Sequence, residues 1–224
     1  YPALALQVLA VSSELGTALE PFYDELIGML DGDLHADVAR LLLAELRRGH
    51  RAALLDAGLL SGACESIELA FDTDVLRLLG ALAHELQATV FLPRLVHRVA
   101  TRYLLQPKFT AACLDVLETL GDDVHTLTLL APIRVGAAPD FLHLIVQRAL
   151  TEKPETQARY LALLRRFLRK EFAAAVVDCK VPNELLRILP AAHTPAVIHA
   201  LLRCLTTLVE QPAFAGHVLF HYIE

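Results

Sequence analysis

Hydrophobic residues recur three and four positions apart along almost the whole chain. Val75, Leu78, Leu79, Leu82 and Leu86 illustrate the spacing. It places apolar side chains on one face of an α-helix, whereas a half-buried strand would alternate apolar and polar residues. No segment keeps such an alternation over the length of a strand. The pattern therefore predicts an all-α protein.

Glycine, proline and short polar steps divide this pattern into many short helices, because these residues end or restart a helix. The predicted breaks lie at Gly32, Gly49, Gly58, Pro107, residues 121–123, Pro132, Gly136, Pro139, Pro154, Pro182, Pro190, Pro195 and Pro212.

Similar helical segments return along the chain. The apolar positions of residues 75–82 are matched by Ile198, Leu201, Leu202 and Leu205, and related spacings follow Pro107 and Pro154. The comparable positions lie about 36 to 47 residues apart, inside or near the range typical of stacked two- or three-helix repeats. Stacked repeats explain this better than a four-helix bundle does.

Three junctions share a more specific pattern, in residues 53–60, 133–142 and 176–186. At each, a helix ends, a small or flexible residue makes a tight turn, and an apolar helix begins at once. Glycine suits the turn, and proline suits the first positions of the following helix. These junctions resemble the turn between the second and third helices of armadillo repeats, and the resemblance covers most of residues 37–210.

The resemblance implies a right-handed α-solenoid of about five imperfect armadillo/HEAT-like repeats. Under this interpretation residues 1–36 form N-terminal capping helices and residues 37–212 form the repeats. Residues 213–224 begin a truncated C-terminal helix or repeat. The absence of an initial methionine fits a piece of a longer protein.

Charge and cysteine content narrow the classes of partner and compartment. The 224 residues carry a formal net charge of -6, which argues against nucleic acid as the partner. The longest uncharged segments are too short for a membrane span. Four widely spaced cysteines without a Cys-x-x-Cys pair predict buried thiols in a reducing compartment. We therefore expect a cytoplasmic protein, with association with the cytoskeleton left open.

The common catalytic motifs are missing from the sequence, including phosphate-binding loops, nucleophile elbows and zinc-protease signatures. We therefore predict no enzyme activity, no cofactor and no metal. The nearest approach to a metal-binding spacing is His217 with His221, one helical turn apart, but no third ligand lies nearby.

The strongest candidate for binding lies in the predicted helix over residues 90–105. Arg94, Arg98 and Arg102 recur four positions apart and so share one side of that helix, with His97 beside them. In armadillo proteins the third helix of each repeat lines a concave groove that binds extended peptides. The resemblance therefore implies a polar floor that continues through further third helices and is formed by Arg94, His97, Arg98, Arg102, His143, Gln147 and Arg187.

A structural role for the same arginines is the alternative. They would then form ion pairs with acids of neighbouring repeats such as Glu65, Glu68 or Asp115. A second basic cluster at Arg165, Arg166, Arg169 and Lys170 is either a solvated helix face or another docking surface.

These observations predict a non-catalytic protein-interaction or scaffold module. Its partner would be an acidic, phosphorylated or amphipathic-helical protein segment bound along the concave surface. Nuclear-import armadillo proteins share a ladder of Trp and Asn, but this chain has no Trp and a single Asn, Asn183, so that mode of recognition is not expected.

Three alternatives remain open. The chain could be a homodimerisation or assembly domain of a larger cytoskeletal or regulatory protein, joined through apolar ends; an enzyme or metal protein; or a nucleic-acid-binding solenoid.

Overall fold

A computed structural model describes residues 2–16, 19–69, 72–87, 89–212 and 214, with the backbone alone at residues 68 and 69. The described chain contains helices and turns and no strand, so the all-α prediction is confirmed. It divides into two compact units, residues 1–120 and 121–224. None of the described helices is both long enough and apolar enough to cross a membrane.

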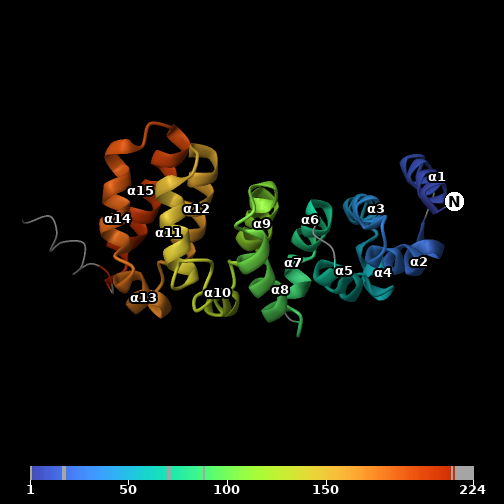
Figure 1. The fold of residues 1–224 in the computed structure, drawn as a ribbon, viewed down its shortest axis with the longest axis horizontal. Coiled ribbons are helices and arrows are strands. Elements are labelled where there is room, and N and C mark those ends of the chain that lie inside the picture. Colours follow the sequence, from blue (N-terminus) through green and yellow to red (C-terminus); the bar gives the residue numbers. More distant parts are fainter. Residues whose placement is uncertain (1, 17–18, 70–71, 88, 213, 215–224) are drawn as a thin grey trace, which may run out of the picture. The chain divides into compact units, whose positions relative to one another are not determined.

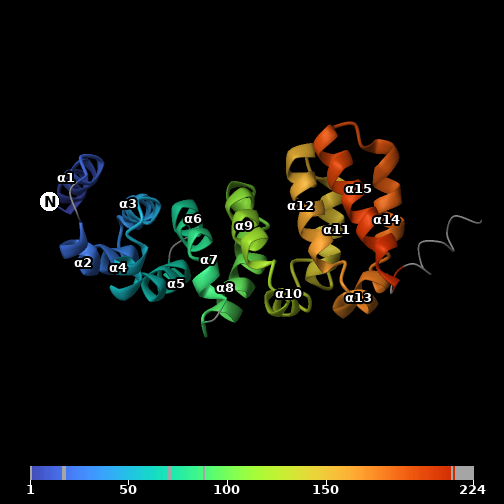
Figure 2. The same cartoon turned by 180° about the vertical axis from the view of Figure 1, so that it is seen from behind.

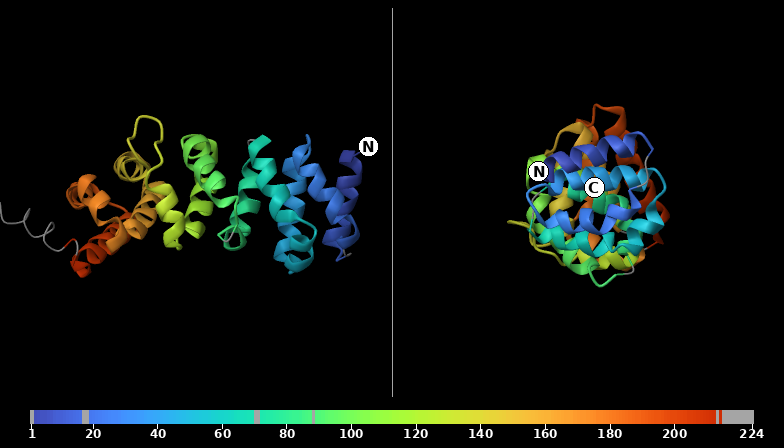
Figure 3. Two further views of the ribbon diagram at one scale, coloured as in Figure 1. Left: turned by 90° about the horizontal axis from the view of Figure 1, so that it is seen from below. Right: turned by 90° about the vertical axis from the view of Figure 1, so that its right-hand side faces the viewer.

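The first unit consists of short helices packed in two rows (Figures 1 and 2). One row contains α3, α6 and α9, in which each helix packs against the next (Figure 3). In the other row α2 packs on α5. Helix α7 and the π-helix η3 pack on α9 of the first row. The helices of this unit are α1 (Pro2–Glu14), η1 (Glu20–Phe22), α2 (Tyr23–Gly28), η2 (Met29–Asp31), α3 (His35–Arg47), α4 (Arg51–Asp56), α5 (Leu59–Leu69), α6 (Thr73–Ala81), α7 (Ala83–Leu86), α8 (Leu92–Arg98), η3 (Val99–Tyr103) and α9 (Pro107–Leu120).

The second unit is built around the longer helices α11, α12 and α15. Helix α12 packs against both α11 and α15, and α14 contacts α11, α13 and α15. The helices of this unit are α10 (Val124–Leu130), α11 (Phe141–Thr151), α12 (Pro154–Phe167), η4 (Lys170–Phe172), α13 (Ala173–Asp178), α14 (Val181–Ile188), η5 (Leu189–Ala191) and α15 (Pro195–Glu210).

Local sequence explains where many of these helices begin. The carboxylates of Asp72, Asp123 and Asp140 accept hydrogen bonds from the first backbone N–H groups of α6, α10 and α11, which stabilises each helix start. Proline occupies the first turn of α12, α14 and α15, where its missing N–H costs nothing.

The three predicted junctions all contain a residue with left-handed backbone. Gly58 has φ 86°, Gly136 has φ 60°, and Lys180 has φ 53°. The third junction therefore departs from the expected pattern, because its turn residue is a lysine and not a small or flexible residue. A residue with a side chain adopts this conformation only at a steric cost.

One part of the predicted repeat match is wrong. Leu79 is fully buried in α6, whereas Leu202, its proposed counterpart in α15, is 51% exposed. Helix α15 instead directs Val197, Leu201, Cys204 and Leu208 into the core. Its buried face therefore differs from the one that the spacing of residues 75–82 suggested.

A buried carboxylate ties α1 and α2 to α3. Glu45 of α3 is 1% exposed. Its carboxylate accepts hydrogen bonds from the hydroxyl groups of Ser13 and Tyr23. The same carboxylate forms an ion pair with Arg48, and its Oε2 lies 2.7 Å from Nδ1 of His50. Burial alone would raise the pKa of Glu45, but its hydrogen bonds to Ser13, His50 and Tyr23 outweigh burial and hold the pKa below the ordinary 4.5. Glu45 is therefore a charged group inside the first unit.

The four cysteines are all in the described part of the chain. Each is buried, and none forms a disulfide, as the sequence predicted. Residues 213 and 215–224, which include His217, His221 and nearly all of the predicted C-terminal segment, lie outside the described residues.

Candidate functional site

A basic surface lies on α8 and η3 in the first unit. Arg94, His97 and Arg102 are exposed, and Arg98 is half-buried. We call these four residues the α8 basic surface. The opposite side of the same helix is held in the core by Leu92, Leu95, Val96, Val99 and Ala100. Core packing therefore fixes which side of α8 faces outward.

The predicted helix over residues 90–105 is helical from Leu92 to Tyr103, but its second half is a π-helix. The N–H of Leu104 donates to the carbonyl oxygen of Val99 at 3.0 Å, a bond spanning five residues. Tyr103 anchors this turn, because its buried hydroxyl donates to the carbonyl oxygen of Ile67 at 2.8 Å. Burial raises the pKa of Tyr103, and the charges of Arg98 and Arg102 partly offset that rise.

An open hollow of about 580 Å³ adjoins the α8 basic surface and is lined by Pro93, Arg94, His97 and Arg98. Arg94 and Arg98 also border a small dimple between α5 and α8, lined by Ile67, Phe91 and other apolar groups. The surface thus combines cationic groups with an open hollow.

The sequence around this surface contains no acidic residue. Between Glu85 and Asp115 the chain carries Arg94, Arg98, Arg102 and Lys108 but neither Asp nor Glu. Positive charge therefore dominates along this segment, which favours a negatively charged ligand.

Two of the predicted residues come together in the second unit. Gln147 of α11 and Arg187 of α14 line a hollow of about 360 Å³ together with Leu150 and Ile188. The guanidinium group of Arg187 forms an ion pair with Glu184 at 2.9 Å. Because Arg94, His97, Arg98 and Arg102 belong to the first unit, the continuous polar floor remains a prediction.

His143 lies in a different cluster, at the start of α11. Its Nδ1 is 2.8 Å from Oδ2 of Asp140 and 3.2 Å from Sγ of Cys179. Cys179 is 7% exposed. Burial, together with Asp140 and Asp178, raises the pKa of Cys179 to about 12. The sulfur is therefore a neutral thiol at pH 7, unlike the thiolate of an activated nucleophile. Sequence reasoning selected His143 but missed Asp140 and Cys179 as its partners.

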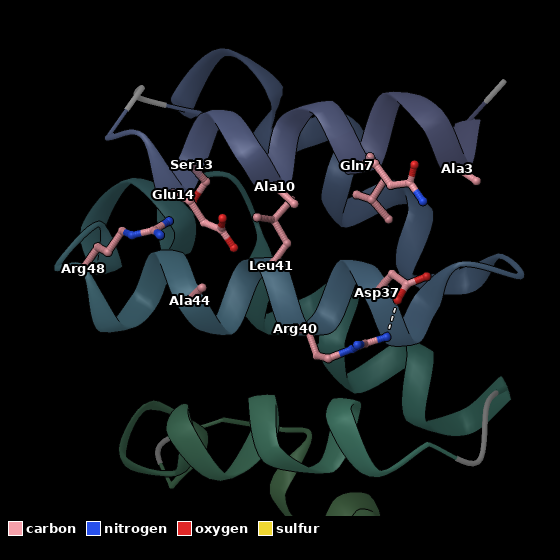
Figure 4. A pocket seen from close by; sticks show the side chains of 11 residues that line it. Ala3, Gln7, Ala10, Ser13, Glu14, Asp37, Arg40, Leu41, Ala44 and Arg48 are labelled. Carbon is pink, nitrogen blue, oxygen red and sulfur yellow. Dashed lines mark hydrogen bonds and ion pairs between the residues drawn. The ribbon is translucent and has the colours of Figure 1, made fainter.

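A further hollow, of about 390 Å³, lies between α1 and α3. Figure 4 shows Glu14 and Arg48 at one end, and Asp37 with Arg40 at the other. Arg40 forms ion pairs with Asp37 and Asp74. Charges of both signs line this hollow, so its walls do not favour a ligand of one charge.

Comparison with known proteins gives no family for this chain, because no protein-family model and no curated protein sequence matches it.

Proposed function

We propose that this chain is a non-catalytic interaction module that binds an acidic or phosphorylated protein segment at the α8 basic surface. The observation that carries the proposal is the hollow lined by Arg94, His97 and Arg98 within an acid-free segment of the chain. Arginine suits such a partner because its planar guanidinium group donates two parallel hydrogen bonds to a carboxylate or phosphate.

The surrounding architecture in this proposal is an armadillo- or HEAT-like solenoid in the cytoplasm. The row of α3, α6 and α9 in the first unit supports it, since each helix packs on the next. Stacked repeats of this kind give an extended, fairly rigid surface without a buried reactive centre.

Reversing three charges tests the proposal. Fluorescence anisotropy would follow a labelled peptide of glutamate and glycine as it binds the parent chain and the variant R94E/R98E/R102E. We expect the variant to bind about 100-fold more weakly, since three surface contacts of up to about 1 kcal/mol each are lost. Binding to the parent should weaken as salt is added, because exposed charges are screened.

The second basic cluster provides a matched control. The variant R165E/R169E/K170E carries the same change in net charge where α12 ends and η4 begins, and it should keep the parent affinity. Circular dichroism would show whether both variants are folded. Equal losses in the two variants, or equal binding of a lysine-glycine peptide by the parent chain, would contradict recognition at α8.

Self-association is a second candidate function, supported by the outer face of α1. Leu4, Val8 and Val11, with Leu15 just beyond the helix, are 61%, 58%, 55% and 81% exposed. Their spacing forms one apolar stripe, and exposed apolar stripes often mark contact surfaces. A second copy of the chain could cover this stripe with its own α1.

Light scattering across a concentration series tests this candidate. We expect the parent chain to approach twice the mass of one chain, and V8E/V11E to keep the mass of one chain. The matched control L202E/V209E changes two exposed apolar residues of α15 instead and should associate like the parent. A parent chain that stays monomeric throughout the series would rule the candidate out.

A further inference from the structure

Three side chains of the second unit direct metal-binding atoms toward one point. A carboxylate oxygen of Asp140, a ring nitrogen of His143 and Sγ of Cys179 all lie within 4.8 Å of one another. We propose that these three residues bind a zinc ion, with solvent or a partner group in the fourth position. This departs from the expectation drawn from the sequence, where Cys179 lies 36 positions from His143 and the three residues match no metal motif.

The hydrogen bonds of the cluster show why a cation suits it. A single ring nitrogen of His143 faces both the carboxylate of Asp140 and the sulfur of Cys179. Nδ1 can carry one proton and point it at one neighbour. A cation between the three atoms would instead accept a lone pair from each of them.

The distances fit a tetrahedral zinc site with little movement. Zinc lies about 2.0–2.3 Å from nitrogen, oxygen and sulfur ligands, so neighbouring ligand atoms are about 3.3–3.6 Å apart. The observed separations are 2.8 Å from His143 to Asp140 and 3.2 Å from His143 to Cys179. These two separations need to widen by only a few tenths of an ångström, and the ligand atoms of Asp140 and Cys179 lie within 4.8 Å of each other.

Each ligand is already held by the fold. The second carboxylate oxygen of Asp140 accepts the backbone N–H of His143 at 2.9 Å, which leaves Oδ2 for the metal. Cys179 follows α13 directly and precedes Lys180, whose left-handed backbone makes the turn into α14. In the first junction Ala57 precedes the corresponding turn residue, Gly58, so a thiol at this place is particular to the third junction.

The charges and exposures agree with a bound zinc ion. A thiolate, a carboxylate and a neutral imidazole together balance the two positive charges of Zn²⁺, and the thiol proton passes to solvent on binding. The side chains of Asp140 and His143 are 31% and 34% exposed, which gives the ion a path and the fourth position access to water. The N-terminus of α11 is electropositive and opposes a cation there, so the three ligands must outweigh it.

Cobalt provides the test, because Co²⁺ binds in zinc sites and its absorption spectrum depends on the ligands that bind it. Titration of the purified chain should give the visible bands of tetrahedral Co²⁺ and a near-ultraviolet thiolate-to-cobalt band, with an endpoint of one ion per chain. Zinc should abolish both signals by displacement. We expect C179A to lose the thiolate band and to bind zinc at least about 100-fold more weakly. Removing a residue that only orients a metal ligand costs up to about 100-fold in affinity, and removing a ligand itself should cost at least as much.

Matched variants separate a metal site from a helix cap. C204A removes another buried thiol and should keep both signals. D140N keeps the cap, because asparagine caps helices as well as aspartate does, yet it should weaken metal binding. Zinc should also raise the unfolding midpoint of the parent and of C204A but not that of C179A, because binding to the folded state alone stabilises it.

Three results would overturn the proposal: no thiolate-to-cobalt band in the parent chain, a band that persists in C179A, or D140N and H143Q binding cobalt as the parent does. D140N and H143Q keep the test decisive even if C179A fails to fold. None of these outcomes depends on peptide binding at α8, so the two proposals stand or fall separately.

Discussion

Replacing Glu45 by alanine should lower the free energy of unfolding by about 3–5 kcal/mol, the range seen when one partner of a buried ion pair is removed. The substitution takes the shared acceptor away from the hydroxyl groups of Ser13 and Tyr23, and it leaves His50 without its carboxylate. Each buried polar group without a partner costs about 1–3 kcal/mol. Urea denaturation followed by circular dichroism would measure the loss.

The charge of Glu45 adds a dependence on pH. Since its pKa in the folded chain lies below the ordinary 4.5, its contribution is complete above that value and disappears as the pH falls through the folded pKa. The difference in stability between the parent and E45Q should therefore narrow on acidification.

As a control, E25A removes an exposed carboxylate of α2 and should stay within about 0.5 kcal/mol of the parent. A loss in E45A no larger than that of E25A would contradict the role assigned to this network.

Replacing Phe167 by alanine should destabilise the second unit by about 3–5 kcal/mol, as expected for a fully buried aromatic ring. Phe167 is 0% exposed. Its ring centre is 6.3 Å from that of Phe141 in α11 and 5.3 Å from that of Phe172 in η4, the latter edge to face. The substitution would leave a cavity where three elements meet.

Hydrogen exchange would locate the effect, with faster exchange expected in α11 and α12. The same chemical change at Phe22, which is 45% exposed, is the matched control and should cost less than about 1 kcal/mol. If F167A and F22A lost equal stability, the aromatic cluster would not be what holds these helices together.

The start points of many helices could be predicted from the sequence because they are set locally. Asp72, Asp123 and Asp140 each bond to backbone only two or three residues ahead. Such short-range preferences are visible in a single sequence. The all-α class follows from the same local signals.

Features set by tertiary packing could not be predicted in this way. Leu202 matches Leu79 in spacing, but its exposure depends on which side of α15 meets α12, and no local pattern carries that information. The same holds for Cys179 and His143, which are 36 positions apart and meet only after α11, α13 and α14 have packed.

The candidate surface could be predicted in part. The four-residue spacing of Arg94, Arg98 and Arg102 indicated a shared side of one helix, and the structure places them on α8 and η3. The hollow beside them, lined by Pro93, Arg94, His97 and Arg98, could not be predicted from that spacing, so only its charge was readable from the sequence.

The π-helix changes the direction in which those three charges run. In a regular α-helix every fourth residue is rotated by about 40° around the axis, so three such residues would follow a slow spiral. A π turn holds more residues than an α turn, so a step of four through it stops about 30° short of a full rotation. The step from Arg98 to Arg102 therefore reverses the rotation of the step from Arg94 to Arg98. The line through the backbone positions of the three arginines therefore runs nearly parallel to the helix axis. A straight ligand can follow this line without winding around α8.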